Sequence, residues 1–407
     1  MTPVLARNHL VLAALAMCAS LSAKAADTFD PATHLLNLGS VSVAGVVYAN
    51  VSARLMEYTL LGVDGGEPVA DTFDPASNLL TLGAVLFQGS TYNNVRVTVN
   101  AYRLLAIAGG PSISQRIAAA TATAQGANND CAAVAPFYWE IGDGNGAQAS
   151  GSVSSAGNPT AYTANSLMGI ASASKWLYSS YVAQRRGGVL GESDIKFLTF
   201  RSGYTNFSTC LPGQTVGSCA AFLTNDLHSI ASDGKFLYDG GHMQNHANLI
   251  GLGALDNAGL AAEVRSQIGA DIGLDYSQPQ PAGGGVSTAK DYARFLRKLL
   301  NGNLAMAGLL GSNAVCTNPT TCPSGQVLGT PVPSYESWHY SIGHWVEDDP
   351  VVGDGAFSSP GAFGFYPWID ASRSSYGIVA RKVDAGWYGS AQCGRQIRQA
   401  WATAIPQ

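Results

Sequence analysis

A repeated segment constrains the first quarter of the chain more than any other sequence feature. Residues 27–32 and 71–76 share the sequence Asp-Thr-Phe-Asp-Pro-Ala, an offset of 44 positions, and Tyr48 matches Tyr92 at the same offset. Each copy alternates apolar and polar residues around a glycine, the pattern of half-buried strands joined by turns. Neither copy could bury an apolar face alone, so we expect the two to pack together. The sequence predicts a small all-β repeat module over residues 26–106, either a binding or spacer module or a plain β appendage.

The segment 109–111 (Gly-Gly-Pro) interrupts any regular element and marks a domain boundary. Beyond it, periodicity predicts a helix over 112–125 and a hairpin from strands 137–141 and 149–153. Later helices are expected at 175–186, 244–254, 289–300 and 391–404, and later strands at 340–346, 362–369 and 376–382. Strands from both ends of the region with helices between them favour a mixed α/β (α+β) domain over residues 112–407.

The first 25 residues have the three-part pattern of an export signal. Arg7 supplies a positive charge, residues 10–19 form an apolar run, and Ala23-Lys24-Ala25 offers small residues at the cleavage position. We expect cleavage after Ala25 and a periplasmic or secreted protein that could associate with the cell envelope. The run is too short for a transmembrane anchor. A lipoprotein is the alternative at Cys18, although Met17 before it is large for such a site.

Six cysteines follow the predicted signal, and an even number in an exported chain points to disulfides. Several connectivities are open from sequence alone. Short loops favour Cys210–Cys219 and Cys316–Cys322, which leaves Cys131–Cys393 to join the two ends of the second domain. A zinc site is the competing interpretation, but no C-x-x-C pair supports it.

Composition and missing motifs narrow the possible functions. Charged residues make up 12% of the chain, and no basic run could bind a phosphate backbone, so no nucleic acid partner is expected. A G-x-S-x-G elbow and a glycine-rich phosphate loop are both absent. The spacing of His242 and His246 is that of a helical zinc site, but Met243 replaces the general base and no third ligand is evident. We therefore expect neither a metal nor a cofactor.

The motif Ser-x-x-Lys is the remaining chemical signal. Residues three apart share a helical face, where a desolvated lysine can take the proton of a serine hydroxyl. The motif begins at Ser172, Ser193, Ser232 and Ser287. Ser193 and Ser287 precede helical segments and are expected as N-caps, and Ser232 lies in a predicted turn. Only Ser172 lies between apolar segments that would bury Lys175 and lower its pKa. The alternative is a helix cap followed by a surface lysine.

Ordered segments between residues 112 and 405 resemble the family of class C β-lactamases, D-Ala-D-Ala carboxypeptidases and related esterases. Residues 170–175 (Ile-Ala-Ser-Ala-Ser-Lys) look like the start of its active-site helix, and residues 282–291 like its glycine-rich helix start. Residues 197–204 and 234–251 resemble the segments that carry its Ser-Gly and Tyr-x-Asn motifs, and residues 340–345 resemble a late strand. The resemblance implies a β-lactamase/transpeptidase-like antiparallel sheet flanked by helices, with a helical subdomain.

The resemblance also implies roles for individual residues. Ser172 would be acylated, Lys175 would activate it, and a tyrosine would pass the proton to the leaving group. Tyr238 takes that role by position, and Tyr204, which begins a Tyr-Thr-Asn triplet, is the alternative. Gly240 stands where the family usually has asparagine, so one group that binds the substrate would be missing.

The family's Lys- or His-Thr-Gly motif corresponds by position to Ser359-Pro360-Gly361, which keeps only the glycine. The lost cation normally helps to hold a substrate carboxylate, so recognition of β-lactams and peptide C-termini should weaken. The carried-over substrate-binding positions are Ser359, Gly361 and Gly240. The N–H of Ser172 and one from the strand after Gly361 would form the oxyanion hole.

These observations predict an exported serine hydrolase that acts through an acyl-enzyme on a small-molecule or peptide-like ester or amide. They favour an esterase or amidase over a β-lactamase. The alternative is a binding or sensing protein that keeps the fold and has lost the reaction. In a third hypothesis the repeat module carries the main role, as a surface adhesion element.

Overall fold

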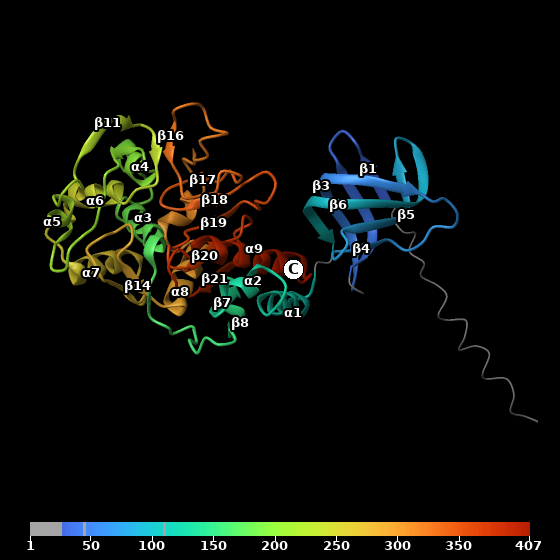
Figure 1. Cartoon of the computed structure of the whole chain (residues 1–407), viewed down its shortest axis with the longest axis horizontal. Helices are drawn as coiled ribbons and strands as arrows, with labels where there is room; N and C mark the ends of the chain where they lie inside the picture. Colours follow the sequence, from blue (N-terminus) through green and yellow to red (C-terminus); the bar gives the residue numbers. More distant parts are fainter. Residues whose placement is uncertain (1–26, 44–45, 109–110) are drawn as a thin grey trace, which may run out of the picture. The chain divides into compact units, whose positions relative to one another are not determined.

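The computed structural model describes residues 27–43, 46–108 and 111–407, which form two compact units (Figure 1). The first unit extends to Ser112, and the second runs from Ile113 to Gln407. The predicted signal peptide lies outside the described residues. Among the residues described, no helix is long and apolar enough to cross a membrane.

The described part of the first unit is a small β-barrel. Its strands are β1 (Asp27–Asp30), β2 (Leu35–Val43), β3 (Val46–Val63), β4 (Thr72–Asp74), β5 (Leu79–Phe87) and β6 (Ser90–Ala108). The strand order is β1-β2-β3-β6-β5-β4, and parallel pairing of β1 with β5 and of β2 with β4 closes the sheet. Alternate residues of β2 and β5, such as Leu36, Leu38, Leu80 and Leu82, are buried, as the period of two of a strand requires.

Residues 44 positions apart make equivalent contacts in the barrel. Asp27 Oδ1 accepts a hydrogen bond from Gly39 N at 2.8 Å, and Asp71 Oδ1 accepts one from Gly83 N at 2.7 Å. A Cβ atom at position 83 would lie 1.8 Å from Val69 O, so only glycine allows this approach. Such contacts are those expected of two packed copies, and the two-copy division stays a prediction.

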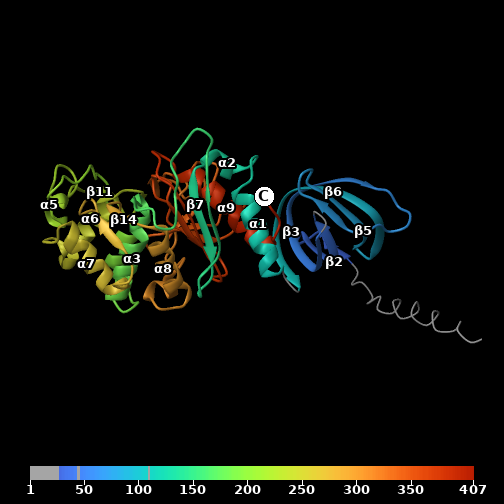
Figure 2. The ribbon, with the colours of Figure 1, turned by 90° about the horizontal axis from the view of Figure 1, so that it is seen from below.

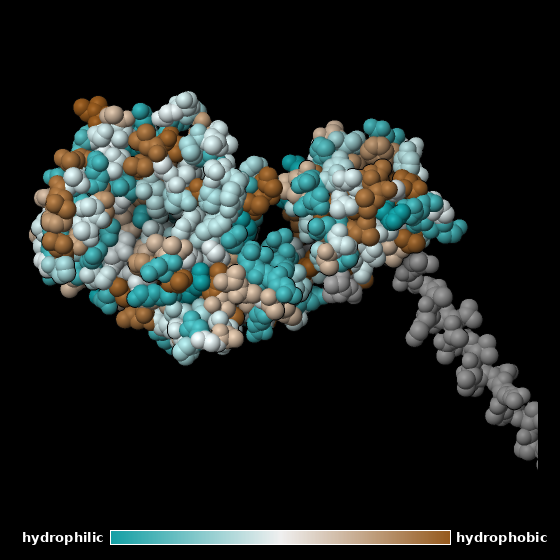
Figure 3. Space-filling model, viewed as in Figure 1, coloured by the Kyte–Doolittle hydropathy of each residue, from teal (hydrophilic) through white to brown (hydrophobic). Residues whose placement is uncertain are grey.

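Apolar side chains are exposed on this unit. Figure 3 shows brown, apolar areas beside teal, hydrophilic ones on the visible face of the barrel. Its exposed large apolar residues include Val47, Leu60, Leu61 and Val69. Exposed apolar residues are common on protein surfaces, so these alone assign no partner.

An antiparallel sheet of eight strands forms the centre of the second unit, whose residues 113–407 are all described. Its strands are β7 (Phe137–Gly142), β8 (Ala147–Val153), β15 (Val315–Cys316), β17 (His339–Tyr340), β18 (Trp345–Glu347), β19 (Ala356–Ser358), β20 (Tyr366–Ile369) and β21 (Tyr376–Ala380). The strand order is β15-β17-β18-β19-β20-β21-β7-β8. The first hairpin of the unit therefore pairs with its last strand, and the mixed α/β class predicted from sequence is confirmed.

Helices cover both faces of this sheet. The helices α1 (Ile113–Ala124), α2 (Asp130–Val134) and α9 (Trp387–Thr403) lie on one side, and α8 (Ala289–Leu300) lies on the other. Figure 2 shows β7 between α8 and the pair formed by α1 and α9. The apolar stripe of α8 has helical spacing, because Tyr292, Phe295, Leu296 and Leu299 are all buried. Its predicted range, 289–300, is the observed one.

The helical subdomain lies between β8 and β15 in sequence. Its helices are α3 (Ser174–Arg185), α4 (Glu192–Leu198), α5 (Val216–Ala220), α6 (Gly241–Ala247) with the π-helical extension Asn248–Leu252, and α7 (Asn257–Ile268). Its short strands are β9 (Met168–Gly169), β10 (Ser202–Tyr204), β11 (His228–Asp233), β12 (Phe236–Leu237), β13 (Leu274–Tyr276) and β14 (Gly285–Ser287). The order β13-β14-β9 forms a small sheet, and β12 pairs with β16 (Val327–Gly329).

Several local predictions are wrong. The strand expected over 340–346 is two strands, β17 and β18, because the chain turns at Gly343 with φ of +69°. The strand expected over 362–369 is confined to β20. Ser193 lies inside α4, whose N-cap is Gly191, and Ser287 ends β14 while Thr288 caps α8. In the last case serine and threonine are adjacent, so the caps could not be told apart from their letters.

The three predicted disulfides are confirmed among the described residues. Cys131–Cys393 joins α2 to α9, so it links the beginning of the second unit to its last helix. Cys210–Cys219 and Cys316–Cys322 close short loops. Bonds of this kind persist in oxidising compartments, which agrees with the predicted export.

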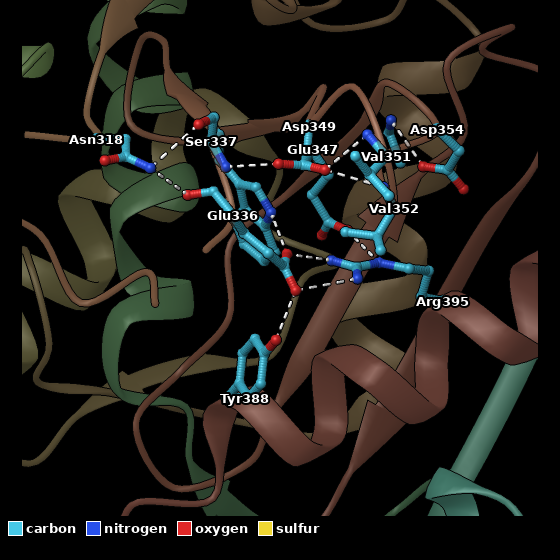
Figure 4. A network of polar contacts seen from close by, with 12 residues as sticks. Asn318, Glu336, Ser337, Glu347, Asp349, Val351, Val352, Asp354, Tyr388 and Arg395 are labelled. Atoms are coloured by element: carbon cyan, nitrogen blue, oxygen red, sulfur yellow. Dashed lines mark hydrogen bonds and ion pairs between the residues drawn. The ribbon is translucent and has the colours of Figure 1, made fainter. Parts of the chain in front are cut away.

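A buried ionic network ties α9 to the sheet. Arg398 Nη2 lies 3.0 Å from Glu347 Oε2, and Arg398 Nε lies 2.6 Å from Asp354 Oδ2. One helical turn earlier, Arg395 Nη2 lies 2.9 Å from Glu336 Oε2. Figure 4 shows Arg395, Glu336 and Glu347 converging beneath the loop that carries Asp354. Burial alone would lower the pKa of Arg398, but Asp354 and Glu347 raise it above its ordinary value.

Candidate active site

Ser172 lies in the 3₁₀ turn η1 (Ala171–Ala173), immediately before α3. The residue before it, Ala171, has φ of +43°, a conformation that costs a non-glycine residue about 1–3 kcal/mol. Neighbouring bonds hold this turn: Ser174 Oγ donates to Ala171 O at 2.6 Å and accepts from Gly285 N at 3.0 Å. Strand β14 therefore fixes the start of α3 in a strained form that presents Ser172.

Lys175 is one helical turn further along the same face. Its Nζ lies 2.9 Å from Ser172 Oγ and donates to Ala282 O at 2.7 Å. The side chain is 5% exposed, and burial lowers its pKa from 10.5 to about 7, with the negative charge of Asp239 offsetting part of the effect. The amine can therefore be uncharged near neutral pH, and both of its polar contacts are with neutral oxygens.

Tyr238 follows β12 and lies beside this pair. Its ring centroid is 4.8 Å from Lys175 Nζ, and the ring stacks on Trp345 at 5.2 Å. Burial raises the pKa of Tyr238 to about 12, while a hydrogen bond with Ser172 acts in the opposite direction. The phenol is thus protonated at neutral pH and lies in hydrogen-bond reach of Ser172.

Tyr204 lies elsewhere. Its ring stacks on Phe197 at 5.7 Å and meets His228 edge to face at 5.1 Å. It does not line the pocket that contains Ser172. Of the two tyrosines proposed from sequence, the structure brings only Tyr238 to the Ser-Lys pair.

A pocket of about 490 Å³ opens above this pair. Its lining includes the side chains or backbone of Ser172, Lys175, Tyr238, Asp239, Gln280 and Phe363. A volume of this size suits a small organic molecule.

Gly240 lines the pocket, and a side chain there would be crowded. A Cβ atom at this position would lie 3.2 Å from Gln280 Nε2 and 3.2 Å from Phe207 Cδ1. An asparagine at this position would require Gln280 or Phe207 to shift by a few tenths of an ångström, and Gln280 brings an amide close to the same place.

Ser359 and Gly361 contact the backbone around Ser172. Ser359 Oγ donates to Ser172 O at 3.0 Å. A Cβ atom at Gly361 would lie 2.1 Å from Ile170 O, so a glycine is needed for the segment to approach the turn. The N–H of Gly361 is bonded to Phe365 O at 2.8 Å. Neither residue lines the pocket, which makes them supports of the nucleophile's turn in this structure.

Sequence analysis missed three groups at the pocket. Asp239 is the unspecified residue inside the Tyr-x-Asn pattern, and Gln280 and Ala282 come from the segment before the glycine run. That run was identified as a helix start, but its letters do not say that the Ala282 carbonyl holds Lys175. This contact joins residues 107 positions apart, and local spacing carries no signal for it.

His242 and His246 do not meet at a common point. His242 Nδ1 lies 2.7 Å from Ser202 Oγ, and burial lowers the pKa of His242 to about 3. His246 Nε2 lies 3.0 Å from Asp194 Oδ1, and its other ring nitrogen faces the hydroxyl of Tyr178. In the part of the chain that the structure describes, no three His, Cys, Asp or Glu side chains are grouped to hold a metal ion.

No family model and no curated protein matches the sequence. Solved structures do match. Simvastatin synthase (LovD) from Aspergillus terreus aligns with a TM-score of 0.48 and 14% identity, over 71% of this chain and 97% of that chain. A D-stereospecific amidohydrolase from Streptomyces sp. gives 0.46 and 13%, over 71% and 98%. A β-lactamase from Mycobacterium bovis gives 0.40 and 14%, over 67% and 96%. These neighbours have the serine β-lactamase-like fold, and their likeness concerns fold alone.

Proposed function

We propose that this protein is an exported serine hydrolase that cleaves an ester or amide through an acyl-enzyme at Ser172. One observation carries the proposal: Lys175 Nζ is buried, lies 2.9 Å from Ser172 Oγ, and forms no ion pair with a carboxylate of the described residues. A serine is a poor nucleophile unless a nearby base takes its proton. An uncharged amine in hydrogen-bond contact is such a base.

The acylation step follows from these positions. One N–H of the neutral amine donates to Ala282 O, which leaves the nitrogen lone pair for the Ser172 hydroxyl. The proton moves to Nζ as Oγ attacks the carbonyl carbon. The proton then reaches the leaving oxygen or nitrogen by way of Tyr238, and the bond to the leaving group breaks. Water attacks the acyl-serine with the same groups acting in reverse, and releases the acid.

The oxyanion would be stabilised by two backbone N–H groups. Ser172 is expected to supply one and the segment after Gly361 the other, since the N–H of Gly361 itself already bonds Phe365 O. Such donors contribute about 3–4 kcal/mol each in acyl-transfer enzymes. The close approach of Gly361 to Ile170 O brings the loop before β20 against the nucleophile's turn.

The substrate is expected to lack the carboxylate that β-lactams and peptide C-termini present. Ser359 replaces the family's cation and its hydroxyl donates to Ser172 O, so no positive group stands at that position. This favours esterase or amidase activity over β-lactamase activity. No cofactor enters the reaction.

The signal-like N-terminus and the three disulfides support a periplasmic or secreted location. We assign the repeat module, residues 26–106, an accessory role. A chain lacking these residues should keep its hydrolytic activity. Loss of activity in a folded variant would instead make the module part of the functional unit.

The direct test is the Ser172→Ala variant. We expect turnover of a panel of short-chain nitrophenyl esters and anilides to fall by about 10⁴-fold or more, and labelling by a fluorophosphonate to disappear. Full labelling of this variant refutes the assignment. If the natural chain shows neither turnover nor labelling, the alternative is favoured, a binding or sensing protein. The crowded position at Gly240 and the hydrogen bond of Ser359 to Ser172 O agree with that alternative.

A further inference from the structure

The pocket contains a single carboxylate, that of Asp239. The other ionisable groups on its lining are the Lys175 amine and the Tyr238 phenol, both assigned to proton transfer above. Gln280, Ser277 and Gln278 add neutral polar groups. When Lys175 is deprotonated and Tyr238 protonated, Asp239 is therefore the group on this lining that can carry a charge.

The bonds of Asp239 leave half of its carboxylate available. Oδ1 accepts from Gly241 N at 2.7 Å and from Phe207 N at 3.3 Å. Both bonds go to the same oxygen, and within the described residues Oδ2 receives no hydrogen bond and no ion-pair partner. Lys175 does not fill this role, because its amine contacts Ser172 and Ala282.

The surroundings of Asp239 disfavour its charged form. Burial raises the pKa of this carboxyl, and only two backbone N–H groups and the more distant Lys175 act against that effect. When Lys175 is neutral, as the reaction requires, the carboxylate loses its one cationic neighbour. A partly buried charge of this kind is stabilised by a partner of opposite sign in the same pocket.

A structural role does not explain the charge. Asp239 Oδ1 caps the first turn of α6 through Gly241 N, but asparagine caps a helix about as well without a charge. The negative charge is thus the feature of Asp239 that capping leaves unexplained.

We propose that Asp239 binds a cationic amine of the substrate, so the enzyme acts on esters or amides that carry a protonated amino group near the scissile carbonyl. This inference rests on the proposed function of Ser172. An ammonium group would donate to Asp239 Oδ2, and Gln280, on the same wall, offers an amide oxygen for a second N–H. The ion pair forms only with the substrate in place, so it selects substrates rather than holding the fold.

The test uses matched substrate pairs in which a methyl group replaces the ammonium. Alanine 4-nitroanilide is compared with isobutyric 4-nitroanilide, and β-alanine 4-nitroanilide with butyric 4-nitroanilide, on the full chain at neutral pH. A charged hydrogen bond predicts that kcat/KM favours the amine by about tenfold or more in at least one pair. Asp239→Asn keeps an acceptor for the N–H of Gly241 and should abolish that preference ratio.

The matched control is Asp256→Asn. Asp256 caps α7 by accepting from Gly259 N at 2.8 Å, is exposed and does not line the pocket, so this variant removes the same charge and should keep the ratio. A natural chain without a preference for amines overturns the inference. Equal losses of kcat/KM on both members of a substrate pair in Asp239→Asn also overturn it. Such losses would indicate that Asp239 only holds the turn before α6.

A binding measurement separates this inference from the proposed function. Alaninamide and isobutyramide are titrated into the Ser172→Ala variant and followed by nuclear magnetic resonance. Preferential binding of alaninamide that Asp239→Asn removes supports the amine site even if the natural chain proves inactive. Equal binding of the two amides overturns the inference, while turnover of neutral esters would leave the proposed function standing.

Discussion

Two regions of the second unit bury positive charges and do so in opposite ways. In the ionic network of α9, Arg398 is 3% exposed and contacts Glu347 and Asp354 within 3.0 Å. In the pocket, Lys175 is 5% exposed and contacts the hydroxyl of Ser172 and the carbonyl of Ala282. The first cation is paired with carboxylates, and the second has only neutral partners.

The difference shows how one fold produces a fixed charge and a titratable one. The guanidinium of Arg398 stays protonated at every accessible pH, and its carboxylate partners raise its pKa further, so its role is to join helix and sheet. Lys175 bonds no carboxylate among the described residues, and desolvation brings its pKa to about 7, where the amine can exchange a proton. The kind of cation and the groups around it together decide whether a buried basic side chain serves structure or chemistry.

Among the substitutions of buried cations, the largest effect is expected from Lys175→Met, which removes the amine and keeps an unbranched apolar side chain that is one atom shorter. Loss of the general base should lower kcat/KM by about 10³-fold to 10⁴-fold. The melting temperature should change little, because a neutral amine with two contacts is replaced by an apolar chain in the same space. Esterase kinetics and thermal denaturation of one preparation check both parts.

The control for this variant is Lys290→Met. Lys290 belongs to the Ser287 copy of the Ser-x-x-Lys motif, but its side chain is exposed at the first turn of α8. Its replacement should leave kcat/KM within about twofold. A comparable loss in both lysine variants would contradict the special position of Lys175.

The next effect concerns the paired cation. Arg398→Met should lower the free energy of unfolding by about 3–5 kcal/mol, because Glu347 stays buried after losing a partner at 3.0 Å. The kcat of the folded fraction should not change, since the network does not line the pocket. Urea denaturation followed by tryptophan fluorescence measures the first value, and active-site titration corrects the second. A loss below about 1 kcal/mol would show that Arg395 compensates.

The reacting side chains of the site could be predicted from sequence, whereas the other residues that line its pocket could not. Ser172 and Lys175 share one helical turn, so local spacing and apolar flanks suffice to pair them. Tyr238 needed an ordered resemblance, because 63 residues separate it from Lys175. Asp239 and Gln280 were missed since they reach the pocket only through tertiary packing. The strand error at Gly343 has a related cause: the alternation of Tyr340, Ser341 and Ile342 is that of a strand, while the glycine is required by its positive φ and by the approach to Ser179 on α3.

A third prediction follows from the pKa of Lys175. Since the amine must be neutral to act as a base, kcat/KM should fall by about tenfold per pH unit below about 7. The folded chain also binds fewer protons than the unfolded chain between about 7 and the ordinary lysine value of 10.5, so stability should rise with pH through that window. Lys175→Met should remove this contribution to the slope, whereas Arg398→Met should retain it.

The variant Asp239→Asn tests the assignment of this pH profile to Lys175. The negative charge of this residue raises the pKa of Lys175, so Asp239→Asn should move the ascending limb of kcat/KM to lower pH. The profile is measured with a neutral ester, to keep substrate charge out of the comparison. A limb that moves to higher pH would mean that Asp239 does not act on Lys175 through charge.

The smallest effect is expected for an ion pair on the protein surface, where water reaches both side chains. Arg96 Nε lies 2.9 Å from Asp64 Oδ2 in the barrel, a distance like those around Arg398, but the two side chains are 46% and 54% exposed. Water screens such a pair and fixing the side chains costs entropy, so Arg96→Ala should change the free energy of unfolding by less than about 1 kcal/mol. Equal distances with unequal costs would show that desolvation makes the Arg398 network strong. A loss at Arg96 as large as that at Arg398 would instead assign the effect to the contacts themselves, and burial would no longer explain the strength of the Arg398 network.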